Sequence, residues 1–189
     1  DEQHLEAARR HALDLHRFKK KDPLPRAAKV IGFLRGVGPQ SLLDIGSGRG
    51  AFLWPLLDAF PGLDVTCVDP LPHRIASIEA VRRGGMANIA AVCGEFPAVD
   101  LGPRTFDVVA LLEVVEHLVD PQPALERAFA LAERFVVVSV PGKPDDNPEH
   151  LHCFDPRDLK ERLNRAGASR VSLMFVPGHT IAIATAARP

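Results

Sequence analysis

Residues 41–50 read SLLDIGSGRG, and this stretch decides the fold. A short apolar run carries one acid, Asp44, and is followed at once by three closely spaced glycines, Gly46, Gly48 and Gly50. The apolar run predicts a buried strand, and the glycines predict a tight turn where the backbone can come close to a ligand. A helix after such a turn offers its unpaired N–H groups to that ligand. The stretch therefore predicts a strand, a turn and a helix, with a ligand site at the turn.

Strand and helix patterns alternate through the rest of the chain. Helices are predicted from the glycine turn through residue 60, over 72–83 and 121–132, and from Pro156 to a stop at Gly167, with Asp155 as the cap. The last two strands flank Pro177-Gly178, which is too short for a parallel crossover, so they form an antiparallel hairpin. In chain order, the seven predicted strands are 41–45, 65–68, 89–93, 106–112, 135–140, 171–176 and 180–185.

Repeated strand–helix–strand units closed by a hairpin predict an α/β, Rossmann-like three-layer sandwich with a mostly parallel seven-stranded sheet. The 189 residues fit one domain, with a core over 41–189 and a helical cap over 1–36. In the cap, an apolar stripe from Leu5 to Phe18 precedes a break at 22–25 and a second helix over 26–35. The basic residues between Arg9 and Lys21 could contact phosphates or a carboxylated substrate, or form a solvated helix face.

The composition indicates the cellular compartment of the protein and the classes of partner that it is expected to lack. The net charge is −1, so no global field attracts nucleic acid or acidic lipid. Three scattered cysteines fit neither a disulfide framework nor a zinc pattern, and no apolar run reaches the length of a membrane span. We therefore expect a soluble, cytoplasmic protein without a membrane partner. The sequence does not specify its oligomeric state.

The acid in the first strand suggests what the glycine turn binds. A carboxylate inside a buried strand is costly unless it meets a partner. Asp44 would repel a pyrophosphate and attract the ammonium group of an amino-acid moiety. Asp69 ends the next strand, where an acid can accept both hydroxyls of a ribose. Two alternatives stay open: a turn without a ligand, and a dinucleotide site, since Gly46, Gly48 and Ala51 also fit that fingerprint.

These motifs, followed by the strand at 106–109 and the stretch LEVVEHL at 112–118, resemble the class I S-adenosylmethionine (SAM)-dependent methyltransferases. The resemblance implies that the glycines wrap the methionine portion of SAM, that Asp69 holds the ribose, and that residues 94–96 border the adenine. Glu95 could equally be a solvated loop carboxylate. The cofactor-binding residues implied are Asp44, Gly46, Ser47, Gly48, Gly50, Asp69, Pro70, Gly94, Glu95, Phe96 and Glu113.

A second group of reactive residues follows the fourth and fifth strands. Ligands of open α/β sheets bind beyond the carboxyl ends of the strands, where Glu113, Glu116 and His117 belong. A helical turn over 113–118 would bring all three onto one face. His150 and His152 follow the fifth strand and would point the same way if that segment is extended. We predict Glu116, His117 and His152 as catalytic residues.

Glu113, Glu116, His117 and His152 also resemble the metal ligands of the methyltransferases that act on the 3′-terminal 2′-hydroxyl of small RNAs. That resemblance implies a divalent ion, Mg, Mn, Fe or Zn, on these four residues. The match is partial, because the tryptophan expected after the Phe154-Asp155 pair is a proline here. Glu-x-x-Glu-His also occurs in methyltransferases without a metal, where His117 would serve as an acid or base.

Together these features predict a methyltransferase (EC 2.1.1.-) that uses SAM to methylate a small molecule, and the histidines favour a hydroxyl oxygen as the acceptor. The alternatives are a metal-dependent RNA ribose 2′-O-methyltransferase, a non-catalytic SAM-binding subunit and a nicotinamide oxidoreductase, which Asp44 disfavours. The lack of tyrosine and the single Trp54 offer few platforms for stacking RNA bases.

Overall fold

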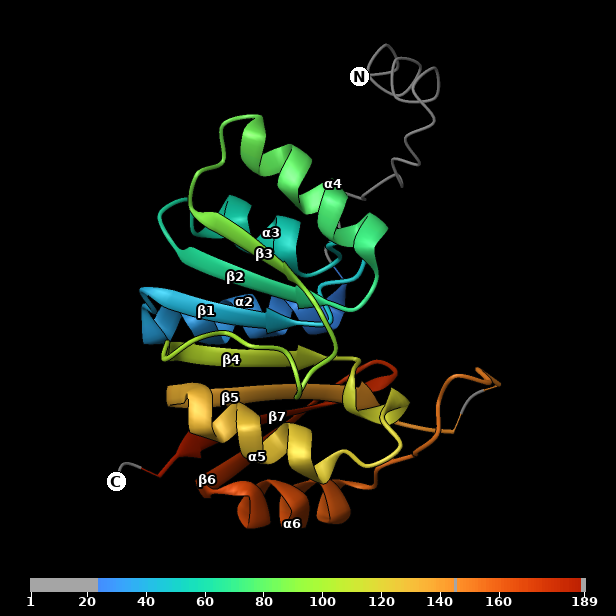
Figure 1. The fold of residues 1–189 in the computed structure, drawn as a ribbon. Helices are drawn as coiled ribbons and strands as arrows, with labels where there is room; N and C mark the ends of the chain where they lie inside the picture. Colours follow the sequence, from blue (N-terminus) through green and yellow to red (C-terminus); the bar gives the residue numbers. More distant parts are fainter. Residues whose placement is uncertain (1–23, 145, 188–189) are drawn as a thin grey trace.

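The computed structural model describes residues 24–144 and 146–187 (Figure 1). The predicted helix between Leu5 and Phe18 and its basic residues lie outside this range, so that part of the predicted cap stays a prediction. Seven strands form one sheet in the order β3-β2-β1-β4-β5-β7-β6. Their bounds are β1 Ser41–Ile45, β2 Asp64–Asp69, β3 Ile89–Cys93, β4 Phe106–Leu112, β5 Ala132–Pro141, β6 Ala168–Val176 and β7 His179–Ala186.

The first five strands are parallel, and β7 runs antiparallel between β5 and β6. Both the parallel sheet and the terminal hairpin confirm the predicted fold class. The strands are found where apolar runs predicted them. Strand β5 begins at Ala132, directly after the preceding helix, rather than at the predicted residue 135.

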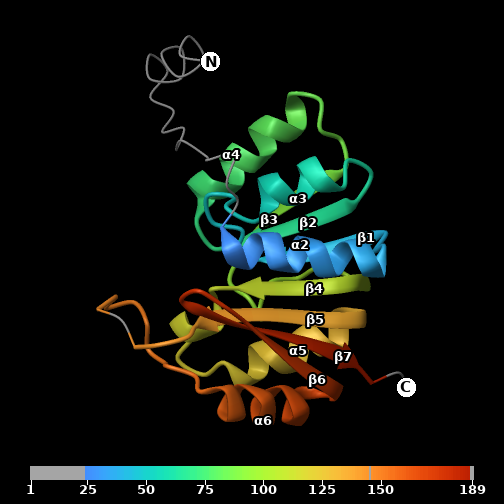
Figure 2. The same cartoon turned by 180° about the vertical axis from the view of Figure 1, so that it is seen from behind.

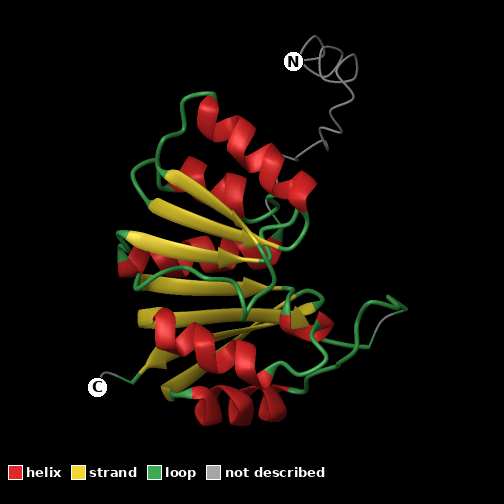
Figure 3. Cartoon of the chain, in the orientation of Figure 1, coloured by secondary structure: helices red, strands yellow, loops and turns green. Residues whose placement is uncertain are grey.

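Helices cover both faces of the sheet and produce the three layers (Figures 1 and 3). α2, α3 and α4 pack on one face through a core that includes Leu34, Leu53 and Ile78. α5 and α6 pack on the other face through a second core that includes Leu125 and Leu159. Figure 2 shows α2 in front of the sheet, whereas α5 lies in front in Figure 1. The helix bounds are α2 Pro25–Val37, α3 Leu53–Ala59, α4 Pro72–Arg83, α5 Gln122–Leu131 and α6 Pro156–Ala166.

Two helix starts explain how the fold positions the site. Helix α6 begins as predicted, because the Asp155 carboxylate accepts the N–H groups of Arg157 and Asp158 and Pro156 takes the first position. Helix α3 begins only at Leu53, because the glycine turn occupies the preceding residues. Parallel strands align their carboxyl ends, so the turn after β1 lies beside the ends of β2 and β4. Among the described helices, none has the length and apolar character needed to cross a lipid bilayer.

Candidate active site

The glycine turn after β1 has a backbone that only glycine adopts easily. Gly46, Gly48 and Gly50 have φ angles of 70°, 57° and 77°. A Cβ on Gly46 would lie 2.6 Å from Cγ2 of Val114, and a Cβ on Gly50 would overlap the Trp54 ring. The turn is fixed by two backbone hydrogen bonds, from the Gly46 N–H to the Val68 carbonyl and from the Gly50 N–H to the Ser47 carbonyl. The predicted tight turn is therefore present, with three glycines that side chains cannot replace without strain.

Asp69 joins this turn to the end of β2. Its carboxylate is fully buried and accepts hydrogen bonds from the N–H groups of Gly48 at 2.8 Å and Leu71 at 2.9 Å. Nη1 of Arg74 lies 3.4 Å from Oδ2 of the same carboxylate. The predicted ribose-binding acid is thus held beside the glycine turn by the backbone itself.

Asp44 is a buried acid whose side chain is not fully satisfied by the protein. Asp44 is 2% exposed, and no described residue forms a hydrogen bond with its Oδ2. Burial raises the pKa of the Asp44 carboxyl to about 7, and the charge of Asp69 acts in the same direction. Asp44 lines a cavity of about 190 Å³ together with the glycine turn, the start of α2 and Glu113. An unsatisfied buried carboxylate on a cavity wall suits a cationic ligand group.

The remaining residues predicted to bind the cofactor lie near the ends of β2 and β3. The N–H of Gly94 donates to the Asp69 carbonyl, and a Cβ on Gly94 would come within 2.7 Å of Val99. Phe96 is 8% exposed and belongs to the core beneath α5, whereas Pro70 and Glu95 are exposed. Ser47, in the glycine turn after β1, is buried and donates its hydroxyl proton to the Asp44 backbone carbonyl. These positions are compatible with a nucleoside lying across the strand ends.

Glu113 does not share a face with Glu116 and His117, because residues 113–118 do not form a continuous helix. The only helical turn in that segment is a 3₁₀ turn, η1, over Val115–His117. Glu113 itself has a φ of 59°, in the left-handed region, and its side chain points to β5 and β7. Oε1 of Glu113 accepts the hydroxyl proton of Ser139 at 2.7 Å. The expected three-residue face is therefore not formed.

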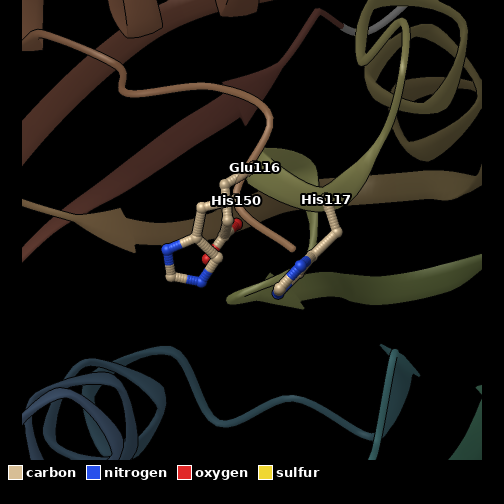
Figure 4. A group of neighbouring side chains, drawn as sticks. All are labelled: Glu116, His117 and His150. Atoms are coloured by element: carbon tan, nitrogen blue, oxygen red, sulfur yellow. The ribbon is translucent and has the colours of Figure 1, made fainter. Parts of the chain in front are cut away.

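Glu116, His117 and His150 come together instead (Figure 4). One potential ligand atom from each lies within 4.8 Å of the others, and Glu116 is fully buried. The two imidazole rings have their centres 4.8 Å apart. Nδ1 of His117 lies 2.9 Å from the Glu149 carbonyl, which can only accept, so Nδ1 carries the proton. Nε2 of His117 is therefore left with its lone pair, as a base or a metal ligand requires.

His152 has a different environment from the one predicted. Its Nε2 lies 2.9 Å from the Leu118 carbonyl and 3.2 Å from the Val119 carbonyl, so it carries a proton and holds the segment after η1. The backbone N–H groups of Leu151 and His152 both donate to the Glu116 carbonyl. This anchoring brings His150, rather than His152, next to the His117 ring.

Arg26 and His179 form a contact near the cavity that was not predicted from the sequence. Arg26, at the start of α2, lines the cavity and places Nη1 3.2 Å from Nε2 of His179, the first residue of β7. They are 153 positions apart, and neither belongs to a recognisable motif. Only the folded sheet, which brings the start of α2 close to the hairpin, could identify them.

Sequence comparison gives the family context of this geometry. Residues 43–134 match a protein-family model described as "Methyltransferase domain". The malonyl-[acyl-carrier protein] O-methyltransferase of Geobacter sulfurreducens is 32% identical over 64% of this chain and 43% of its own length. A ubiquinone biosynthesis O-methyltransferase of Methylobacterium nodulans is 42% identical over 49% of this chain and 36% of its own. The chain thus matches less than half the length of these curated relatives.

Solved structures share the fold at low sequence identity. An O-methyltransferase family protein from Burkholderia thailandensis superposes with a TM-score of 0.73 at 15% identity, over 86% of this chain and 55% of that one. The magnesium protoporphyrin IX methyltransferase of Synechocystis, solved with bound SAM, superposes with a TM-score of 0.68 at 18% identity, over 86% of this chain and 78% of that one. The chain thus has the fold of these methyltransferases, and its residues 43–134, which include the glycine turn and its two acids, match the methyltransferase family model.

Proposed function

We propose that the chain binds SAM in the cavity at the glycine turn and transfers its methyl group to an oxygen of a small-molecule acceptor. The observation that carries this proposal is the buried carboxylate of Asp44, whose Oδ2 has no partner among the described residues. The ammonium group of the SAM methionine moiety would supply that partner. A pyrophosphate would instead be repelled by the carboxylate.

Arg26 supports the same assignment from another side of the cavity. The methionine tail of SAM is a zwitterion, with an ammonium group and a carboxylate on one carbon. Asp44 and Arg26 both line the cavity and carry the two complementary charges. A guanidinium binds a carboxylate through paired N–H donors. We assign Asp44 to the ammonium end and Arg26 to the carboxylate end of this tail.

The other cofactor contacts follow from the strand ends. Asp69 accepts the ribose hydroxyls, while Gly46, Ser47, Gly48 and Gly50 approach the methionine chain. Pro70, Gly94, Glu95 and Phe96 border the adenine. Glu113 lines the same cavity and is assigned to its wall. The Gly48 N–H holds the Asp69 carboxylate beside the glycine turn, which orients it for the ribose.

We assign the acceptor to the region beyond the ends of β4 and β5, beside the histidine cluster. The acceptor oxygen attacks the methyl carbon, the sulfur–methyl bond breaks, and the hydroxyl proton passes to a base. We assign that base to Nε2 of His117, whose lone pair is set by the hydrogen bond of Nδ1 to the Glu149 carbonyl. His150 and the buried Glu116 lie beside it, and His152 holds the loop. The names of the curated relatives favour an oxygen acceptor in this chain too.

The test is methyl transfer from radiolabelled SAM to two acceptors, 3,4-dihydroxybenzoate and a malonyl thioester, after SAM binding has been measured by calorimetry. An aryl methyl ether as the product would favour the hydroxyl acceptor, and a methyl ester of the malonyl thioester would favour the carboxylate acceptor. His117→Ala should lower phenol methylation about a hundredfold or more while SAM binding is kept. His73→Ala is the matched control, because His73 is exposed on α4, away from the cluster. SAM binding without transfer to any acceptor would support the non-catalytic alternative.

A second candidate is metal-assisted methylation of a hydroxyl, including the ribose 2′-hydroxyl of RNA. The observation that favours it is the group of one buried carboxylate and two imidazoles, a donor set that suits Mn, Fe or Zn. The proposed ligands are Glu116, His117 and His150, in place of the predicted set that included Glu113 and His152. Manganese added to metal-free protein should bind with 1:1 stoichiometry, and His150→Ala should abolish that binding. Turnover that is unchanged by a chelator would exclude a metal role in the reaction.

A further inference from the structure

We infer that His179 is a positioning residue, which together with Glu113 holds the Arg26 guanidinium at the cofactor cavity and so sets the affinity for the carboxylate end of the cofactor. This inference rests on the proposed binding of SAM. His179 itself does not line the cavity, whereas Arg26 and Glu113 do. Its effect on the cofactor would therefore be transmitted through these two side chains.

Glu113 is the fixed centre of this arrangement. It is the only described non-glycine residue with a positive φ, 59°, a conformation that persists only where the surroundings impose it. Strand β5 imposes it here: the Glu113 N–H donates to the Ser139 carbonyl, and the Ser139 hydroxyl donates to Oε1. Both carboxylate oxygens then face the start of α2 and the start of β7. Oε1 lies 3.9 Å from Nε of Arg26, and Oε2 lies 3.1 Å from Nε2 of His179.

His179 contacts both Arg26 and Glu113 through one ring nitrogen, Nε2. Its Nδ1 lies 3.3 Å from the Pro177 carbonyl, which orients the ring, and its Nε2 faces both Glu113 and Nη1 of Arg26. Nε2 can accept from the guanidinium or donate to the carboxylate, but it cannot do both at once. In either state the imidazole contacts both Arg26 and Glu113. The side chain of Arg26, at the start of a helix, is thus restrained by residues of β4 and β7.

Removing the His179 imidazole should lower the affinity for the cofactor, although the positive charge of Arg26 that binds the cofactor carboxylate is kept. Arg26 is a long side chain with many rotamers, and ordering it when the ligand binds would lower the affinity. The loss should appear only for ligands that carry the α-carboxylate. A general distortion of the site would instead weaken every ligand with the same adenosine portion.

The experiment compares S-adenosylhomocysteine (SAH) with its decarboxylated analogue, which keeps the adenosine and the amine. Calorimetry on the full chain would be run for wild type, Arg26→Gln, His179→Ala, His179→Gln and the exposed control His73→Ala. We expect His179→Ala to weaken SAH binding about tenfold and to leave the analogue within about twofold. His179→Gln should restore most of the SAH affinity, because an amide can accept from Arg26 and donate to Glu113 at the same time.

The outcomes separate this inference from the proposed function. If wild type fails to bind SAH, the proposed function itself fails. If wild type binds SAH and Arg26→Gln removes the preference for the carboxylate, but His179→Ala does not, only the role of His179 is overturned. An equal loss for both ligands in His179→Ala would mean a structural role alone and would also overturn it. A melting curve for each variant identifies any that does not fold, and His179→Gln then provides the decisive comparison with His73→Ala.

Discussion

The carboxylate of Asp69 accepts a 2.8 Å hydrogen bond from the backbone N–H of Gly48. This bond joins the end of β2 to the turn after β1. The acid proposed to hold the ribose and the glycines proposed to hold the methionine chain therefore form one unit. Substitutions of Asp69 should therefore weaken binding of the ribose, and substitutions of the glycines should weaken binding of the methionine chain.

Replacing Asp69 should weaken every ligand that carries the ribose. In Asp69→Asn the single amide oxygen can accept only one of the two backbone N–H bonds that Oδ1 and Oδ2 accept, and the amide has no charge to strengthen the bonds from the ribose hydroxyls. We expect the affinities for SAH and for 5′-methylthioadenosine to fall by similar factors, about tenfold each, in calorimetry. Asp64→Asn, at the exposed start of β2, is the control. A loss confined to SAH would argue against the ribose assignment.

A side chain at Gly46 should disturb both stability and binding. In Gly46→Ala the methyl group would approach Cγ2 of Val114 to 2.6 Å at a φ of 70°, so the turn must shift. We expect a loss of about 1–3 kcal/mol in the free energy of unfolding, measured with urea, together with weaker SAH binding. Gly38→Ala is the matched control, since Gly38 also has a positive φ but a Cβ there meets no neighbour within 4 Å. Gly38→Ala should lower the free energy of unfolding but leave SAH binding unchanged.

The stability of the ligand-free protein should fall as the pH rises through 7. Burial raises the pKa of Asp44 from 3.8 to about 7, so between these values the folded chain keeps a proton that the unfolded chain has lost. The contribution of this group is complete below about pH 4 and is lost as the pH rises through its folded-state pKa. Asp44→Asn removes this dependence.

In thermal melts, the stability of Asp44→Asn relative to that of wild type should therefore be greater at pH 8 than at pH 5. A difference of a few kcal/mol at most corresponds to several degrees in Tm for a domain of this size. If the difference between the two proteins is the same at both pH values, the carboxyl of Asp44 does not have a raised pKa.

The affinity for SAH should rise with pH in the same range. Because the pKa of Asp44 is about 7, roughly one tenth of the free protein is ionised at pH 6 and nine tenths at pH 8. The ammonium group of SAH binds the ionised form, so the affinity should increase up to about tenfold from pH 6 to pH 8. Calorimetry in buffers of equal ionic strength measures this change. A flat profile for wild type would contradict the assignment of Asp44 to the ammonium group.

His152 and His117 should give opposite results when each is replaced by alanine. His152→Ala removes the donor to the Leu118 and Val119 carbonyls and should lower the free energy of unfolding by about 1–2 kcal/mol. His117→Ala, at a half-exposed ring, should change stability little and lower methyl transfer about a hundredfold or more. Urea unfolding and the radiolabel assay separate the two roles. A stable His152→Ala variant without activity would return His152 to the reacting centre.

Much of the fold could be predicted because it depends on local patterns. Strands β1, β3 and β4 and helix α4 have the predicted bounds, since apolar runs and glycine or proline stops determine them. The glycine turn and its two acids were equally predictable, because the positive φ angles and the cost of a buried carboxylate are properties of single residues.

The histidine end of the site could not be predicted, because tertiary contacts decide it. The left-handed conformation of Glu113 depends on Ser139 in the neighbouring strand. The choice of His150 over His152 depends on a loop whose backbone donates to the Glu116 carbonyl. Arg26 and His179 meet across 153 positions, a contact that no periodic pattern signals.

The most direct test of the central claim is calorimetry of SAH and 5′-methylthioadenosine against wild type and Asp44→Asn at pH 8. The two ligands share the adenosine, and only SAH has the amino-acid tail. If the buried carboxylate of Asp44 binds the ammonium group, the variant should lose about tenfold or more in SAH affinity and should bind methylthioadenosine as wild type does. Equal SAH affinity in the two proteins, or no SAH binding by wild type, would contradict it.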